Sequence, residues 1–181
     1  MSARDAMLAR RSRSKVAGDD APDRAELLDL LGAAATVADH GRLSPWRVIE
    51  VRGDARLRLG RALAEAAGKS GISDKPLRAP LLLAVVTSRQ RSSKAPDWEQ
   101  DATAAGVAHA LSLLLDEAGW GVFWRTGDAV RSAPVRALHG LGSGEELLGW
   151  LYVGRPATDP SKPRHPVDVD ARLTALDPAV S

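Results

Sequence analysis

The chain has 181 residues, of which 44% are hydrophobic and 27% are charged, and its formal net charge is +2. These values are typical of a globular protein and exclude an intrinsically disordered chain. It contains no cysteine, which excludes disulfides, thiolate metal sites and cysteine nucleophiles. No apolar run approaches the roughly 20 residues that a membrane-spanning helix needs. We therefore expect a cytoplasmic protein with no membrane partner.

The first half of the chain predicts three helices and one strand. A short helix within residues 1–9 comes first. Asp23 is placed to cap the second helix, with Glu26 as its capping-box partner, and the helical pattern ends near residue 40. Alternating residues at 46–52 predict a strand that directs Trp46 and Val48 to one face. Asp54 is expected to cap a third helix at about 55–67.

The second half predicts strands and helices in alternation, followed by a tail. The run "PLLLAVVTS" is apolar throughout, which indicates a strand buried on both faces. The other expected elements are a long central helix at 97–118, a strand within 119–127, a short helix with Pro134 in its first turn, and a strand at 146–156. Residues 157–181 are rich in proline and aspartate and form an extended tail. The result is one α/β layered domain over residues 1–181.

The segment "ARRSRSK", residues 9–15, concentrates positive charge near the start. Over residues 1–15, five lysine and arginine side chains oppose Asp5, giving +4, so the remainder carries −2. Three interpretations compete, namely a phosphate site, a nucleic-acid site and a solvated basic terminus. A nucleic-acid binder is usually basic over a broad face, so the confined charge argues against that function.

Several known nucleotide-binding and metal-binding motifs are not matched by this sequence. "GLGSGEE" has Glu145 where a dinucleotide-binding loop needs its third glycine, and it follows a predicted helix instead of a strand. "GKS" at residue 68 lacks the upstream glycine of a phosphate-binding P-loop, because Leu63 occupies that position. The four histidines show no metal-ligand spacing. His109 lies in the long predicted helix, where we expect a core histidine.

Five motifs nevertheless follow one another in a recognisable order. They are "RRSRSK", "ATVADHGRLSPW", "KAPDWEQ", "GWGVFWRTG" and "GWLYVGRP". Together, over roughly residues 8–156, they resemble the FMN-dependent nitroreductase family, and in particular its small single-domain members. The resemblance implies a three-layer α+β fold with a mostly antiparallel central sheet flanked by helices, in a homodimer whose C-terminal tail extends to the partner subunit.

The resemblance also implies a cofactor, FMN, and an electron donor, NADH or NADPH. Arginine and serine suit the FMN phosphate, since they offer a planar fork of donors and a short hydroxyl donor. The cofactor-binding residues implied by family position are Arg10, Arg11, Ser12, Lys15, Thr36, His40, Trp124, Arg125, Thr126 and Arg164. Trp98 is expected in the substrate pocket. Ser44 stands where relatives often have glutamine, and Lys15 where they usually have arginine.

The function implied by the resemblance is reduction of nitroaromatic, quinone or related small-molecule acceptors by two-stage hydride transfer. No side chain is placed as a nucleophile or an acid–base pair, which suits an enzyme whose cofactor carries the chemistry. Two alternatives stay open. One is a flavin-binding or storage protein of the same fold that does not turn over. The other is a nucleic-acid-binding protein that uses the basic N-terminal stretch.

Overall fold

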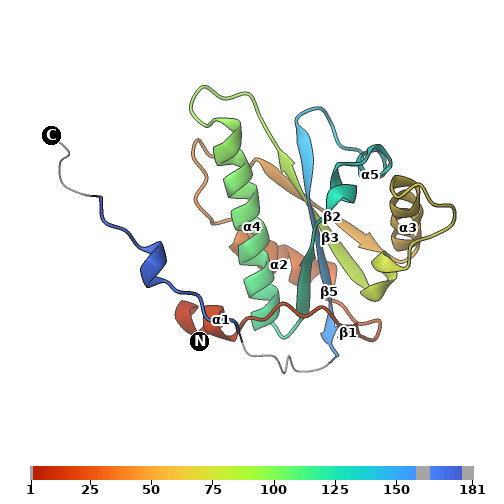
Figure 1. Cartoon of the computed structure of the whole chain (residues 1–181), viewed down its shortest axis with the longest axis horizontal. Helices are drawn as coiled ribbons and strands as arrows, with labels where there is room; N and C mark the ends of the chain where they lie inside the picture. The colour runs from red at the N-terminus through yellow and green to blue at the C-terminus, as the bar shows by residue number, and fades with distance from the viewer. Residues whose placement is uncertain (1, 158–163, 177–181) are drawn as a thin grey trace.

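The structure is a computed structural model, and it describes residues 2–157 and 164–176. The chain forms a central sheet with helices on both sides (Figure 1). The helices are α1 (Ala3–Ala9), α2 (Arg24–Ala34), α3 (Asp54–Ala66), α4 (Asp97–Glu117) and α5 (Ala133–Leu138), with 3-10 turns η1 (Lys75–Arg78), η2 (Asp128–Arg131) and η3 (Asp170–Arg172). The strands are β1 (Val16–Ala17), β2 (Trp46–Arg52), β3 (Leu81–Ser88), β4 (Gly121–Arg125) and β5 (Glu145–Pro156).

The strands pair antiparallel throughout the sheet. β3 pairs with β2 on one side and with β5 on the other, and β5 also pairs with β4 and with the short β1. The outer edge of β4 meets the N-terminal segment through a parallel bridge between Ser12 and Val122. The expectation of a mostly antiparallel sheet is therefore confirmed.

The buried strand β3 separates two apolar layers. Leu81, Leu83 and Val85 pack toward α2 and α4, whereas Leu82, Ala84 and Val86 pack toward α3 and α5. Side chains of a strand alternate between the faces of a sheet, so an uninterrupted apolar strand requires cover on both sides. This arrangement confirms the predicted three-layer fold.

Two predicted helix ends are wrong. The second helix ends at Ala34 instead of near residue 40, and the hydroxyl of Thr36 bonds the carbonyl of Ala33 at 2.8 Å. Threonine side chains compete in this way with helical backbone bonding. The third helix is capped by Gly53, whose φ of 49° suits glycine, and Asp54 lies in the first helical turn.

Capping and burial also differ from expectation at two positions. Asp23 caps α2 as predicted, accepting from the backbone of Glu26 at 2.9 Å. The Glu26 carboxylate instead accepts from the indole of Trp120 at 2.7 Å, tying α2 to the end of α4. His109 is exposed on α4, not buried in the core, and its ring meets that of Trp124 edge-on at 5.1 Å.

A buried histidine does occur, on the opposite side of the sheet. His139 is 7% exposed, and its Nδ1 bonds the carbonyl of Val135 at 2.8 Å. Its Nε2 accepts from the Trp150 indole at 3.2 Å. Both bonds together require the neutral ring with the proton on Nδ1. Burial, together with the nearby Arg47 cation, lowers the pKa of His139.

This histidine predicts a pH-dependent stability. A lowered folded-state pKa means that the unfolded chain binds the proton first, so stability falls as the pH drops below the ordinary value of 6.5. Urea titrations between about pH 7 and 5 give the change of the unfolding free energy with pH. In His139→Gln this change should be smaller than in wild type, by up to the amount that corresponds to one bound proton. The bond to Arg47 lowers the pKa of Glu145 to about 2, so protonation of Glu145 reduces the stability only at lower pH. Equal slopes in both proteins would contradict the assignment.

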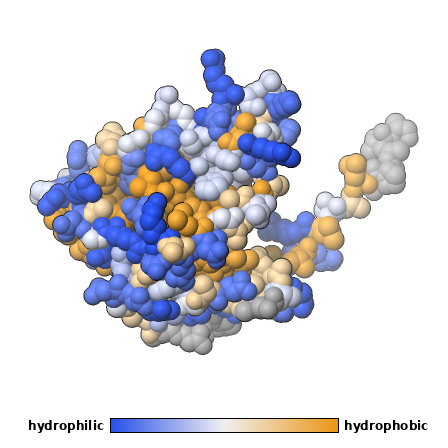
Figure 2. All heavy atoms as spheres, turned by 180° about the vertical axis from the view of Figure 1, so that it is seen from behind, coloured by the Kyte–Doolittle hydropathy of each residue, from blue (hydrophilic) through white to orange (hydrophobic). Residues whose placement is uncertain are grey.

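The described part of the tail projects from the body of the molecule (Figures 1 and 2). Its large apolar side chains are exposed, with Leu173 at 82% and Leu176 at 97%. At its start, the Arg164 guanidinium bonds carbonyl groups at the end of α1. The predicted tail of residues 157–181 also includes 158–163 and 177–181, which lie outside the described residues.

Candidate functional site

The basic N-terminal segment is fixed to the C-terminal end of α4. The backbone N–H of Arg11 bonds Asp116 at 3.4 Å, and the Arg13 guanidinium lies 3.8 Å from the same carboxylate. The Arg13 backbone N–H donates to the Val122 carbonyl at 2.8 Å. These contacts explain why the segment runs along the outer edge of β4. Beside them Arg10 reaches the hydroxyl of Ser12 at 3.4 Å.

Three guanidinium groups gather around the last turn of α1. Arg11 donates to the carbonyl of Leu8 at 2.9 Å, and Arg164 donates to the same carbonyl at 3.1 Å and to that of Arg10. Desolvation and the neighbouring charges of Arg11 and Arg10 lower the pKa of Arg164. The mutual repulsion of these cations makes the cluster a place where a bound anion is stabilising.

Lys15 lies farther along the chain, where it leads into β1. Its carbonyl accepts from the backbone of Ala157 at 3.3 Å, and its side chain is exposed. The structure therefore places Lys15 beside the end of β5, while Arg10, Arg11, Ser12 and Arg164 come together at α1.

Beyond this cluster, the outer edge of β4 pairs with no strand in the described part of the chain. Residues of β4 alternate in the direction of their backbone groups, and Val122 turns its carbonyl outward to Arg13. Trp124 therefore directs its backbone groups to the same outer edge. From Val122 to Thr126 the strand direction covers about 13 Å. An elongated ligand with its anionic end at Ser12 would follow this edge toward Thr126.

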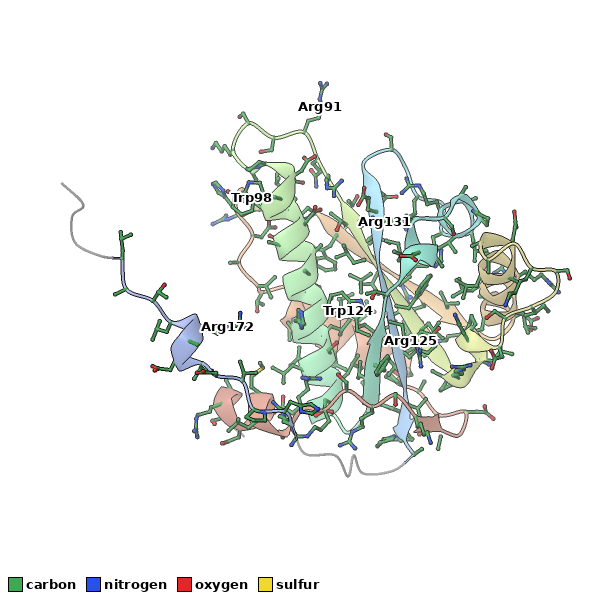
Figure 3. All side chains as sticks on the ribbon, in the orientation of Figure 1. Arg91, Trp98, Trp124, Arg125, Arg131 and Arg172 are labelled. Carbon is green, nitrogen blue, oxygen red and sulfur yellow. The ribbon has the colours of Figure 1, made fainter. Side chains whose placement is uncertain are left out.

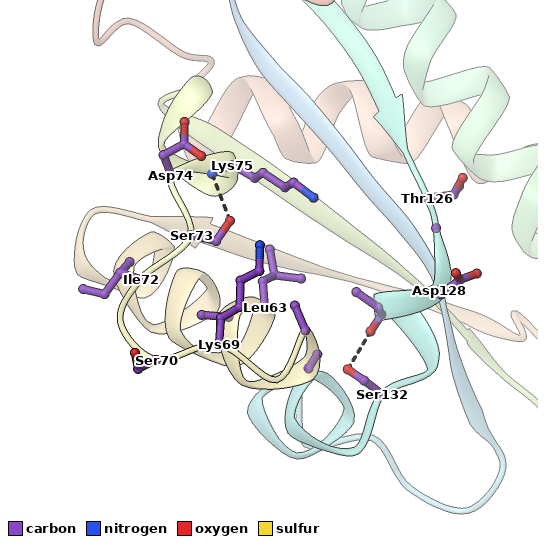
Figure 4. A pocket seen from close by; sticks show the side chains of 15 residues that line it. Leu63, Lys69, Ser70, Ile72, Ser73, Asp74, Lys75, Thr126, Asp128 and Ser132 are labelled. Atoms are coloured by element: carbon purple, nitrogen blue, oxygen red, sulfur yellow. Dashed lines mark hydrogen bonds between the residues drawn. The ribbon is translucent and has the colours of Figure 1, made fainter.

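A cavity of about 800 Å³ opens at the far end of this edge (Figure 4). One wall is the end of α3 with the following loop, and the other is the segment from Thr126 to Ser132. Lys69 and Lys75 direct their ammonium groups into the space between these walls (Figure 4). Asp74 also lines the cavity, and it is paired with Arg78 at 3.1 Å.

Trp124 and Arg125 lie on opposite faces of the sheet. Trp124 packs toward α4, whereas Arg125 turns to the α3 side, with its guanidinium carbon 4.8 Å from the Phe123 ring and 5.0 Å from the Tyr152 ring (Figure 3). Within the described part of the chain, the buried Trp124 Nε1 and Arg125 Nε have no hydrogen-bond partner. Unsatisfied buried donors are rare, and they mark positions where a bound molecule can supply an acceptor.

The remaining predicted residues lie at the other end of α4. His40 Nδ1 and Glu99 Oε2 are 2.7 Å apart, and the indole of Trp98 is 68% exposed (Figure 3). They line a cavity of about 380 Å³ between α4 and the loop after α2. Thr36 is exposed at the end of α2.

Ser44 belongs to the loop that leads from this cavity into β2. Its φ is 45°, and its backbone N–H bonds the side chain of Asp39 at 2.7 Å. Asp39 also accepts from the backbone of Leu43 at 3.2 Å. The aspartate thus fixes the shape of the loop, while the Ser44 side chain is not part of these bonds.

Apart from Lys15, the structure thus divides the predicted site residues into three places, which are the α1 cluster, the end of β4 and the His40 end of α4. From Trp98 to Asp116, α4 spans about 27 Å, because each residue adds roughly 1.5 Å. Sequence reasoning missed Lys69 and Lys75. The glycine- and serine-rich loop that carries them was predicted, but nothing in its spacing indicated that it faces Thr126.

The described residues contain neither a candidate metal site nor a candidate membrane-spanning helix. Among residues 2–157 and 164–176, no group of three or more histidine, aspartate or glutamate side chains is placed to hold a metal ion. In the same part of the chain, no helix combines the length and apolar character needed to cross a membrane.

Comparison with known proteins identifies the family. The model of the nitroreductase family matches residues 7–155. An Escherichia coli K12 protein named "Putative NAD(P)H nitroreductase YdjA" is 32% identical, with 86% of this chain and 89% of that protein covered. The chain therefore belongs to the nitroreductase family, as its motifs predicted.

Two solved structures show the same fold. A nitroreductase-like family protein from Bacillus cereus superposes with a TM-score of 0.81 at 19% identity, covering 98% of this chain and 97% of the other. The FMN and NADPH-dependent nitroreductase NfnB from sphigopyxis sp. strain HMH gives a TM-score of 0.69 at 23% identity, covering 98% and 100%. The predicted nitroreductase-like fold is thus confirmed.

Proposed function

We propose that this protein is an FMN-dependent oxidoreductase that uses NADH or NADPH to reduce nitroaromatic, quinone or related acceptors. The observation that carries the proposal is the outer edge of β4, which joins a cationic cluster at one end to a lysine-lined cavity at the other. FMN has the same layout, because a ribityl chain separates its phosphate from its planar ring. The FMN and NADPH dependence named for NfnB supports the same cofactor.

The residues present fit this cofactor. Arg10 and Ser12 would hold the phosphate, with Arg164 and Arg11 adding positive charge while they tie α1 and the tail together. The unsatisfied indole N–H of Trp124 offers a buried donor, which lies over β5 beside Gly149. An FMN-binding role for these residues follows from their positions and from family resemblance.

At the ring end, Thr126 and Lys75 would hold the planar part of the cofactor. The bound flavin supplies hydride transfer, so the protein needs no nucleophile of its own. The Lys75 ammonium would place a fixed positive charge beside the bound ring. The Arg125 guanidinium, which lies over the Phe123 and Tyr152 rings, would add a second positive charge near Lys75 and Thr126.

We further propose a homodimer that completes the site. The His40 and Trp98 end of α4 is too far from the Asp116 end for one cofactor to touch both. A two-fold axis across α4 would bring one protomer's His40, Thr36 and Trp98 beside the partner's cationic cluster. The outward face of α4 carries the small residues Ala102, Ala105 and Gly106, which permit close approach. The tail, with its exposed Leu173 and Leu176 side chains, would then cover the partner subunit.

The dimer has a direct test. Sedimentation equilibrium at micromolar concentration should give twice the chain mass of 19.2 kDa. A mass of one chain in protein that carries flavin would contradict the shared site. The expected cytoplasmic location and the tail's contact with the partner both remain predictions.

The first experiment on function is the visible spectrum of the purified protein, before and after adding FMN. Flavin absorbance bands that bleach with NADH or NADPH under anaerobic conditions, and return with a nitroaromatic, would support the oxidoreductase. Bands that resist bleaching would favour the storage protein of the same fold. A colourless protein that fails to bind FMN would overturn the proposal. Salt-dependent binding to DNA or RNA would then favour the nucleic-acid alternative.

A further inference from the structure

We propose that Lys69 makes this enzyme selective for a ligand that presents an anionic group, carboxylate or phosphate, beside the flavin ring. The inference rests on the proposed function, and it concerns the second molecule in the site, not the cofactor. Lys69 lies at the start of the loop between α3 and η1, where its backbone N–H bonds the carbonyl of Ala64 at 2.9 Å. The loop therefore holds the side chain at the mouth of the cavity.

The cavity has the volume of a small-molecule site and extends away from β4. Small-molecule sites measure roughly 300–1,000 Å³, and this one measures about 800 Å³ in a single chain. Thr126 and Lys75 form the part next to β4, where the flavin ring is proposed to lie. Lys69 and Ser70 form the part away from β4, on the opposite side from Thr126 (Figure 4). A substrate stacked on the ring would thus extend toward Lys69.

The balance of charge around this space favours an anion. Four ionisable side chains line it, namely Lys69, Asp74, Lys75 and Asp128. The Asp74 carboxylate is paired with Arg78, which leaves two ammonium groups and the Asp128 carboxylate, a net charge of +1. Neither lysine ammonium is in an ion pair with another described residue. An ammonium group without a carboxylate partner binds a ligand anion at no cost of breaking an existing pair.

Two sources could supply the anion, an acceptor with a carboxylate or NADPH with its additional phosphate. The experiment compares wild type with Lys69→Gln, using 4-nitrobenzoate against neutral 4-nitrobenzamide, and NADPH against NADH. Loss of a charged hydrogen bond predicts that Lys69→Gln lowers one of these two kcat/KM ratios about tenfold. A fall in the nitrobenzoate ratio assigns the anion to the acceptor, and a fall in the NADPH ratio assigns it to the donor.

Matched variants separate a local contact from general surface charge. Arg61→Gln removes one cation from the exposed face of α3, away from the cavity, and should leave both ratios unchanged. Lys69→Arg keeps the charge and should restore the wild-type preference. A second readout is binding of unreactive benzoate to the oxidised protein by calorimetry, which Lys69→Gln should weaken about tenfold if the anion belongs to the acceptor.

Two outcomes would overturn the inference. One is that neither ratio changes in Lys69→Gln, and the other is that Arg61→Gln changes them equally. Reduction of the neutral nitrobenzamide by wild type tests the proposed function independently. If that reaction proceeds while the ratios stay constant, the enzyme assignment stands and only the role of Lys69 fails.

Discussion

Replacing Gly149 with alanine should destabilise the protein by about 2–5 kcal/mol, the largest single-residue effect that we expect. Gly149 has a φ of 135°, which side chains rarely adopt. An added Cβ would also lie against the Arg125 carbonyl oxygen and within 2.8 Å of Trp124 Nε1. β5 can therefore accept only glycine where it passes β4. Thermal unfolding followed by circular dichroism measures the loss.

Gly119→Ala is the matched control for this substitution. Gly119 has a φ of 86°, but no atom lies within 4 Å of its hypothetical Cβ, so only the backbone strain of about 1–2 kcal/mol applies. The difference between the two variants isolates the clash with β4. Equal losses of stability in the two variants would show that β4 can shift to accommodate the added methyl group without an energetic cost. Because the clash falls on Trp124 and Arg125, Gly149→Ala should also weaken FMN binding, whereas Gly119→Ala should not.

Replacing Arg10 with glutamine should raise the dissociation constant for FMN about 10- to 100-fold. Arg10 is the cation of the cluster that reaches the Ser12 hydroxyl, whereas Arg11 and Arg164 bond α1 carbonyls. A guanidinium bound to phosphate forms charge-assisted hydrogen bonds, which are about twice as strong as neutral ones. Quenching of flavin fluorescence during titration of the apoprotein measures the constant.

Arg4→Gln provides the control for Arg10→Gln, since it removes the same charge from the exposed surface of α1. It should leave the dissociation constant within about twofold of wild type. If both variants weaken binding equally, the effect is general attraction and the phosphate lies elsewhere. Added salt should reduce the difference between wild type and Arg10→Gln only partly, because Arg10 is half-buried.

The bounds of α4 show where local sequence patterns were sufficient to predict an element. The repeat of small and branched residues predicted this helix almost to the residue, because periodic burial is a local property of the sequence. Helix ends were less predictable. Thr36 and Gly53 altered the expected boundaries of α2 and α3, since side-chain bonding and a positive φ outweighed the apolar pattern there.

The sequence by itself determined the order of helices and strands, the double-sided burial of β3 and the five motifs that indicate the family. Only the tertiary structure decided which charges meet. Arg164 reaches α1 from the far end of the chain, Asp116 holds the basic segment against β4, and Lys69 and Lys75 face Thr126 across a cavity. Periodicity reports which face of an element is buried. Contacts between distant side chains depend instead on strand order and loop paths, which no local pattern encodes.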